Sequence, residues 1–274
     1  MRTRTRVDLT LTVVLAIVIG GILVPFGWVV LNAFKSDTEI FGDPVGLPRH
    51  WIIGNFVTAW TTGGFAQYSA NSLIVSVAAT LLTLAVCLPA GYVFAKLAGP
   101  RVNLLFYLLL LTMTVPAEAI VIPIFYQMRS LGLLDSRVGL ILVIVAGGLP
   151  LGVFIMRNFF KDLPGTLAEA AEIDGASTWR TFTQVMAPLA RPAILAVAVF
   201  AFLGSWNEYI LALLLLFSNE KMTIPLGLTQ FQDQYNSDYG ALFAGITMAM
   251  IPSILVYLVL QRSFTQGLLA GSMK

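Results

Sequence analysis

Residues 138–156 read VGLILVIVAGGLPLGVFIM, a run of 19 uncharged residues between Arg137 and Arg157. A membrane-spanning helix needs about 20 predominantly apolar residues. Because the hydrocarbon core of a membrane holds no water to satisfy an open backbone, such a run is expected to be helical. The stretch therefore predicts a transmembrane helix, and it sets the fold class for the chain around it.

Five further apolar stretches flank this one. Long intervals between charged residues place the six predicted spans at residues 9–34, 72–95, 104–128, 138–156, 192–217 and 240–261. The composition agrees, because 58% of the residues are hydrophobic and only 11% are charged, whereas soluble domains carry about 25% charged residues. We therefore predict an all-α membrane protein with six transmembrane helices, and we exclude a soluble enzyme.

The scarcity of charge, histidine and cysteine excludes further kinds of function. The net charge of +2 is too small for a nucleic-acid-binding protein. His50 is the single histidine and Cys87 the single cysteine, so neither a multi-histidine metal site nor an intrachain disulfide is available. We expect no catalytic residue, no metal site and no cofactor on this chain.

Lys and Arg are unevenly divided between the two sides of the predicted membrane. Eleven lie in the N-terminus, the 96–103 loop, the 157–191 loop and the C-terminus, against five in the opposite loops. Since positive residues accumulate on the cytoplasmic side, both termini and the 157–191 loop are predicted to be cytoplasmic. The N-terminus resembles a signal peptide, but Leu23–Phe26 offers no small-residue cleavage site, which favours an uncleaved first span.

The 157–191 loop is unusually polar for this chain and has the signals of local structure. It holds eight charged residues. Thr166 and Glu169 have the spacing of a capping box, which predicts a short helix over about 167–173 that breaks at Gly175. A second helix is expected over about 177–186, ended by Pro188 and Pro192, which also start the next span. The small Ala170 and Ala171 between charged residues indicate a helix that inserts into a groove of a partner protein.

This loop carries a family resemblance. Its sequence resembles the EAA loop of the permease subunits of ABC importers at Glu169-Ala170-Ala171, Asp174-Gly175-Ala176, Phe182, Pro188-Leu189 and Arg191-Pro192. The resemblance implies a coupling helix, in the loop between helices 4 and 5, that docks on an ATPase subunit through Glu169, Ala170, Ala171, Asp174, Gly175 and Ala176. Trp179 and Phe182 are expected to pack against helices of this chain instead.

The resemblance extends over essentially the whole chain. Residues 205–209, 223–228 and 267–271 are similar to the carbohydrate branch of the family, and more narrowly to the second permease of maltose-type importers. It implies a type I ABC importer permease fold. Residues 1–70 would form an N-terminal tail, the first span and the first outer loop, residues 71–265 the transmembrane core, and residues 266–274 a cytoplasmic tail.

The resemblance also implies a heteromeric complex in the cell membrane. Its other members would be a second, different permease, two ATPase subunits that bind ATP and Mg²⁺, and an extracytoplasmic sugar-binding protein. The sequence agrees with this division, because it contains no Gly-Lys dipeptide and therefore no nucleotide-binding P-loop.

Two further sets of residues are candidates for contact with substrate or binding protein. A carboxylate inside a membrane costs several kcal/mol, about 3 or more, unless it is paired, neutral or beside water. Glu208 therefore lines the translocation path or forms an inter-helix structural pair that holds the two permeases together, and for Glu118 we favour the structural pair. The path candidates are Trp206, Asn207, Glu208 and Tyr209. The outer-loop candidates for binding-protein contact are Gln232, Asp233, Gln234 and Tyr235.

Two other classes of protein remain as alternatives. An ion-coupled secondary transporter could use Glu118 and Glu208 as intramembrane ion sites. An intramembrane enzyme is the weaker alternative, because the chain lacks H-E-x-x-H and its histidine falls outside the spans. The organised cytoplasmic loop favours the importer permease over both.

Overall fold

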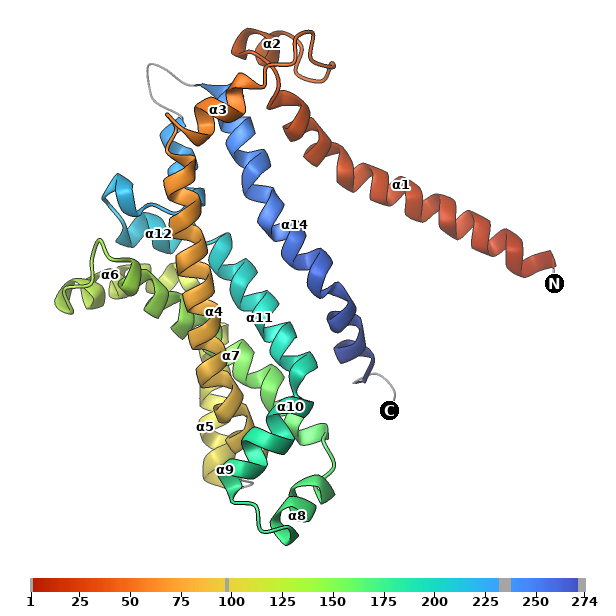
Figure 1. The fold of residues 1–274 in the computed structure, drawn as a ribbon, viewed down its shortest axis with the longest axis vertical. Coiled ribbons are helices and arrows are strands. Elements are labelled where there is room, and N and C mark those ends of the chain that lie inside the picture. Colours follow the sequence, from red (N-terminus) through yellow and green to blue (C-terminus); the bar gives the residue numbers. More distant parts are fainter. Residues whose placement is uncertain (1, 97–98, 232–237, 271–274) are drawn as a thin grey trace. The chain divides into compact units, whose positions relative to one another are not determined.

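A computed structural model describes residues 2–96, 99–231 and 238–270 of the chain (Figure 1). Within these ranges every regular element is helical, and no strand occurs. The predicted all-α fold class is therefore confirmed. The fold follows from long apolar stretches that satisfy their own backbone groups in helices.

The helices follow one another with short connections. In chain order they are α1 (Arg2–Asn32), α2 (Asp37–Gly42), α3 (Gly54–Trp60), α4 (Phe65–Lys96), α5 (Pro100–Leu111), η1 (Thr112–Thr114), η2 (Ala117–Ile120), α6 (Val121–Ser130), α7 (Arg137–Asp162), α8 (Thr166–Ile173), α9 (Thr178–Thr181), η3 (Phe182–Met186), α10 (Ala187–Leu189), α11 (Arg191–Trp206), α12 (Ile210–Leu215), η4 (Asn219–Lys221), α13 (Ile224–Gly227), η5 (Leu228–Phe231) and α14 (Tyr239–Ala270).

Four helices in the described ranges are long and apolar enough to cross a membrane without a break. They are α4, α7 and the stretches Leu9–Asn32 of α1 and Tyr239–Val259 of α14. The number rises to six if each of two bent helix pairs counts as one span. The predicted third and fifth spans, 104–128 and 192–217, each contain a break between helices, and the count of six spans stays a prediction.

The third span breaks between η1 and η2. The Thr112 and Thr114 hydroxyls donate to the carbonyl oxygens three residues earlier, at 2.6 and 2.7 Å. Val115 is extended, with φ −84° and ψ 118°, as expected for the residue before a proline, and Pro116 has no N–H to continue the helix. The two arms of the pair, Pro100–Thr114 and Glu118–Ser130, are bent by 92°.

The fifth span breaks at residues 207–209, between α11 and α12. The Asn207 side chain donates to the Leu203 carbonyl at 2.8 Å, which ends α11. The Glu208 carboxylate accepts from the Leu211 N–H at 2.8 Å, and so caps the first turn of α12. Two adjacent polar side chains thus end one helix and begin another.

The chain divides into two compact units. Unit 1 holds residues 1–66 and 227–251, and unit 2 holds residues 67–226 and 252–274. In unit 1, Trp28 of α1 meets Phe243 of α14 edge-on, with ring centroids 5.3 Å apart. The Asn55 amide donates to the carbonyls of Ala33 and Lys35 at 3.0 and 2.9 Å. The side chains of α1 from Leu9 to Trp28 are exposed throughout.

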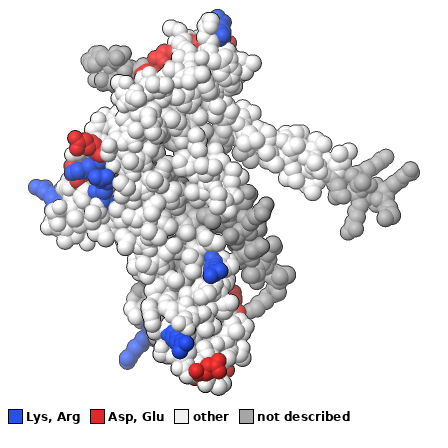
Figure 2. Space-filling view, in the orientation of Figure 1, with Lys and Arg blue, Asp and Glu red and all other residues white. Residues whose placement is uncertain are grey.

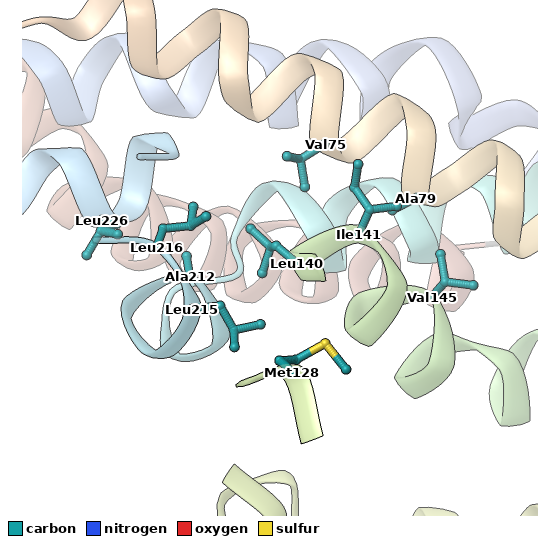
Figure 3. Packing of buried hydrophobic residues seen from close by; sticks show 10 residues of the cluster. All are labelled: Val75, Ala79, Met128, Leu140, Ile141, Val145, Ala212, Leu215, Leu216 and Leu226. Atoms are coloured by element: carbon teal, nitrogen blue, oxygen red, sulfur yellow. The ribbon is translucent and has the colours of Figure 1, made fainter. Parts of the chain in front are cut away.

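Unit 2 has two apolar clusters at different levels along its helices. The first joins α4, α6, α7 and α12 (Figure 3), through Val75, Ala79, Met128, Leu140, Ile141, Val145, Ala212, Leu215, Leu216 and Leu226. The second joins the later halves of α4 and α7 to α5, α11 and the segment after α8, through Cys87, Phe106, Val153, Met156, Phe160, Phe182, Met186, Ala190, Ala193 and Val197. Along the chain, the break in the third span lies between Phe106 of the second cluster and Met128 of the first. The break at residues 207–209 lies between Val197 of the second cluster and Ala212 of the first.

Candidate coupling and translocation sites

Helix α8 is the short helix that the sequence predicts in the cytoplasmic loop. Its beginning differs from the prediction, because Gly165 is the N-cap and already has helical dihedrals, φ −59° and ψ −31°. The Leu167 N–H donates to the Pro164 carbonyl and the Ala168 N–H to Gly165. Thr166 is thus inside the helix and its side chain caps nothing. The predicted capping box of Thr166 and Glu169 is wrong.

The end of α8 is as predicted. Gly175 has φ +77°, the left-handed conformation that glycine adopts without steric cost. The Ala176 N–H donates to the Ala171 carbonyl at 2.9 Å, and the Gly175 N–H donates to Glu172 at 3.0 Å. These two bonds form a Schellman motif, which satisfies the last carbonyls of the helix. The residues of the Asp174-Gly175-Ala176 triplet are therefore the residues that terminate α8.

No residue of α8 is buried. Its acidic side chains, Glu169 and Glu172, are exposed, as is Asp174 at its end. Ile173 is 86% exposed, which is unusual for a large apolar side chain at the end of a helix. On the face that Figure 2 shows, charged side chains of unit 2 gather around α8 to α10 and again near α6 and α12, and the surface between these two groups is almost uncharged. The helix thus presents a mixed acidic and apolar surface, of which no residue is buried.

The segment after α8 attaches it to the second apolar cluster. The Phe182 ring packs against Tyr92 of α4 with centroids 5.1 Å apart, and Tyr92 meets Phe160 of α7 at 5.4 Å. The prediction that Phe182 packs within the chain is confirmed. The same prediction for Trp179 is wrong, because its side chain touches Phe182 at a centroid distance of 5.5 Å but remains 69% exposed.

Pro188 lies inside the second helix of this loop, whereas Pro192 lies in the first turn of the next helix, as predicted. The helical path continues from α9 through one π-helical turn, η3, into α10, where Pro188 occupies the first turn and needs no N–H bond. The direction changes only afterwards, and Thr178–Leu189 is bent by 74° against α11. The loop is thus a rigid helical connection between α8 and α11.

The predicted path residues lie at the break between α11 and α12, but they do not form one surface. Trp206 is buried and stacks on Phe202 with ring centroids 5.7 Å apart. Asn207 is exposed and Tyr209 is 37% exposed, while Glu208 is half-buried with its carboxylate on the Leu211 N–H. Their assignment to the translocation path stays a prediction.

Glu118 lies at the other helix break, in the turn η2, and is exposed. The single ion pair found among the described residues joins Lys221 and Asp135. The pair expected to join Glu118 to the second permease stays a prediction. Gln232, Asp233, Gln234 and Tyr235, the binding-protein candidates, lie outside the described residues. The described residues contain no cluster of side chains suited to a metal ion.

Sequence reasoning missed a set of polar residues at the other end of unit 2. Asp135, between α6 and α7, bonds Lys221 and Ser218, and Asn71 of α4 bonds the backbone of Glu220 and Met222. No local pattern indicates these pairs, because their members lie 83 residues or more apart in the sequence and each stands in an ordinary polar loop or helix end. They fix the segment that follows α12.

The chain matches a protein family over residues 87–269, described as the binding-protein-dependent transport system inner membrane component. It is 40% identical over 255 residues to the diacetylchitobiose uptake system permease protein NgcG of Streptomyces coelicolor, covering 92% of this chain and 84% of that protein. It is 30% identical over 249 residues to the arabinooligosaccharides transport system permease protein AraQ of Halalkalibacterium halodurans, covering 89% of this chain and 88% of that one.

The fold also matches a solved structure. A chain in the crystal structure of a bacterial ABC transporter involved in the import of the acidic polysaccharide alginate superposes with a TM-score of 0.83 at 26% sequence identity. The match covers 96% of this chain and 98% of that chain. Fold and sequence thus lead to the same group of transporters.

Proposed function

Because the chain belongs to the binding-protein-dependent inner membrane component family, within the sugar ABC permeases, we propose that it couples ATP hydrolysis on partner subunits to sugar import. Such permeases are multi-pass membrane subunits and not enzymes themselves. In this proposal α8 docks on one of two ATPase subunits, which carry ATP and Mg²⁺. A second, different permease and an extracytoplasmic sugar-binding protein complete the complex.

The proposal rests on the exposure of α8, together with the packing of the segment that follows it against the long helices of unit 2. The helix buries none of its own residues, and Ile173 and Trp179 expose apolar surface beside three carboxylates. An exposed apolar patch rimmed by polar groups is typical of a protein–protein contact. The Schellman motif and the Phe182 packing connect this surface to α4 and α7. A movement of the docked partner would therefore be transmitted to the membrane helices.

Alternating access of a path between the two permeases is the mechanism we propose. The break at residues 207–209 supports it, because non-helical backbone at membrane depth is tolerated where it is buried in protein or lines a water-filled cavity. Asn207, Glu208 and Tyr209 offer the amide, carboxylate and aromatic groups that suit sugar hydroxyls and ring faces. Nucleotide binding and hydrolysis would shift the population between outward-open and inward-open states.

The ion-coupled alternative is not favoured. Its intramembrane carboxylates were Glu118 and Glu208, which lie in two different helix breaks. Glu208 already caps α12, and the family match is to the inner membrane component of binding-protein-dependent transport systems.

The experiment that tests the proposal is uptake into proteoliposomes that contain the complete complex, with the purified binding protein outside. We expect uptake of a chito- or arabino-oligosaccharide to require ATP inside the vesicles and to be unaffected by collapsing ion gradients. Uptake that survives without ATP and stops when the gradients are collapsed would overturn the proposal.

The contribution of α8 is tested in the same vesicles with a Glu169→Ala variant. We expect uptake to fall while ATP hydrolysis continues, or the ATPase to be lost from the purified complex. The matched control is Glu220→Ala, which removes another exposed carboxylate of unit 2 far from α8 in sequence. Normal uptake by the Glu169 variant with the ATPase still bound would contradict the coupling role.

A further inference from the structure

Asp135 lies in the turn between α6 and α7 and has an unusual backbone conformation. Its φ is +50°, and it is the one non-glycine residue with positive φ in the described part of the chain. This region is disfavoured for side chains with a Cβ, and aspartate is among the few that enter it. Its N–H donates to the Leu215 carbonyl, the last residue of α12, at 2.7 Å. The turn is thus shaped to meet the end of α12.

The carboxylate of Asp135 binds the segment that follows α12. One oxygen accepts from the N–H groups of Phe217 and Ser218, both at 2.9 Å. The other accepts from the Ser218 hydroxyl and from the Lys221 ammonium, the latter at 2.7 Å. Lys221 also donates to the Asp135 carbonyl at 2.7 Å. Six hydrogen bonds therefore join this one residue to residues 215–221.

Charge strengthens this arrangement. The Lys221 ammonium, followed by the Ser218 hydroxyl, holds the pKa of the Asp135 carboxyl well below its ordinary value. The carboxylate is therefore charged at neutral pH, and hydrogen bonds to a charged acceptor are roughly twice as strong as neutral ones. The Asp135 and Lys221 side chains remain 25% and 37% exposed, so the ion pair by itself contributes little. The attachment of residues 215–221 to Asp135 therefore depends on the number and geometry of the hydrogen bonds.

The same segment is held from α4. The Asn71 amide donates to the carbonyls of Glu220 and Met222 at 2.8 and 2.9 Å. Arg137 of α7 donates to the Asn71 side-chain oxygen at 2.9 Å. Residues 215–222 are thus bonded to Asp135, in the turn before α7, and to Asn71 of α4, which Arg137 links to α7.

Helix α12 depends on this attachment. It has six residues, and a helix of that length is not stable alone in water. Ala212 and Leu215 are buried in the first apolar cluster, against α6 and α7. At its other end, the Leu211 N–H holds the Glu208 carboxylate. The position of Glu208 therefore follows from the position of α12, which Asp135 holds at its C-terminal end.

From this chain of contacts we infer that Asp135 is a positioning residue for the translocation path: it anchors the C-terminal end of α12 and thereby places Glu208 and Tyr209 at the helix break. The inference rests on the proposed function, because the break is assigned to the path there. It adds a residue that lies in a loop outside the predicted spans and that touches no substrate.

The test uses the complete complex in proteoliposomes with its binding protein. Asp135→Gly keeps the backbone conformation accessible and removes the carboxylate, while Asp135→Asn keeps one acceptor for the two N–H groups and loses the ion pair. We expect Asp135→Gly to lower ATP-driven uptake on the order of tenfold, because small misplacements of positioned groups have effects of at least this size. Asp135→Asn should lie between this variant and the native protein.

Two milder variants, Ser218→Ala and Asp135→Asn, distinguish an effect on the position of the helix break from an effect on folding. Ser218→Ala removes one bond to the Asp135 carboxylate, and Ser130→Ala is its matched control, since the Ser130 hydroxyl donates only locally to Gln127. The reporter is Tyr209→Cys, labelled by a thiol reagent, because the natural Cys87 is buried. We expect Ser218→Ala and Asp135→Asn to change the labelling rate of this cysteine severalfold, and Ser130→Ala to leave it unchanged.

The outcomes are distinct from a failure of the proposed function. If the native complex shows no ATP-dependent uptake, the proposed function fails, and the labelling of Tyr209→Cys still decides whether Asp135 positions the break. Unchanged labelling in both Asp135→Asn and Ser218→Ala overturns the inference. If the complex with Asp135→Gly does not assemble, the labelling of Tyr209→Cys in Asp135→Asn and Ser218→Ala decides whether Asp135 positions the break.

Discussion

Gly175 shows how one residue sets the shape of the end of α8, the proposed coupling helix. Its φ of +77° lets the chain turn directly after α8, so that the Gly175 and Ala176 N–H groups close the helix. A residue with a Cβ in this conformation costs roughly 1–2 kcal/mol. The EAA loop therefore requires glycine here for backbone reasons, whatever the partner contacts of its neighbours.

Gly175→Ala is expected to reduce the ratio of sugar transported to ATP hydrolysed, because the end of α8 must change shape. Gly165→Ala is the matched control: Gly165 begins the same helix with φ −59°, and an added Cβ would meet only the Glu169 carboxylate at 3.8 Å. The ratio is measured in proteoliposomes. Equal ratios for the two variants would show that the Gly175 conformation is irrelevant to coupling.

Asp135 gives a prediction on pH. Its pKa in the folded protein is lowered below the ordinary value of 3.8, chiefly by Lys221. A lowered pKa stabilises the folded state at every pH above the unfolded value, and this contribution is lost as the pH falls below it. We therefore expect Asp135→Asn to lower the unfolding temperature of the complex by a constant amount between about pH 5 and pH 7.

Below pH 3.8 the native protein and Asp135→Asn should converge in unfolding temperature, because the Asp135 carboxyl of the unfolded chain then takes up a proton more readily than that of the folded protein, where its pKa is lower. The measurement is thermal unfolding of the detergent-solubilised complex along a pH series. Lys221→Met serves as the control, since it removes the cation and should show the same convergence. A difference that stays constant through this range would mean that the ion pair does not stabilise the fold.

At the scale of the elements, α4 and α7 come close together at two glycines. A Cβ on Gly152 of α7 would overlap the Cys87 sulfur, and a Cβ on Gly91 of α4 would overlap Met156. Small residues at helix contacts let backbones approach, which is the usual basis of helix packing in membranes. The contact places Cys87 and Met156 together in the second apolar cluster.

Gly152→Ala is expected to destabilise the protein by about 1–3 kcal/mol, the usual cost of overpacking. Gly148→Ala, one helical turn earlier, is the control, because its Cβ would meet Thr83 only at 3.8 Å, beside a cavity of about 60 Å³. Chemical unfolding of the purified protein in detergent checks both. The double variant Gly152→Ala with Cys87→Ala should recover part of the loss, and equal stability of both single variants would contradict the packing argument.

At the scale of the whole molecule, the main open expectation is orientation. The distribution of Lys and Arg predicts that α8 is cytoplasmic, and that the loop after α12 lies on the outer side. Ile173 and Phe217 mark these two regions, and both side chains are exposed, at 86% and 56%.

A membrane-impermeant thiol reagent should therefore label Ile173→Cys only from the cytosol and Phe217→Cys only from outside. The buried Cys87 leaves a low background in both variants. Cells and inside-out vesicles provide the two directions of access. Labelling of Ile173→Cys from outside intact cells would reverse the topology and remove the basis of the coupling proposal.

The sequence by itself determined the properties that depend on local composition and spacing. Long uncharged runs predicted membrane helices, and residues 169–176 predicted a short helix that ends at Gly175. These predictions hold because a helix satisfies its own backbone, and because a glycine turn needs only the residues next to it.

Only the tertiary structure decided how distant segments fix one another. Asp135 and Lys221 are 86 residues apart, and neither has a local signal for the other. The break at 207–209 appeared in sequence only as two polar residues in an apolar run. Trp179 stayed exposed because helix spacing gives the face of a side chain but not what covers that face. Such contacts depend on the path of the whole chain, which local patterns do not contain.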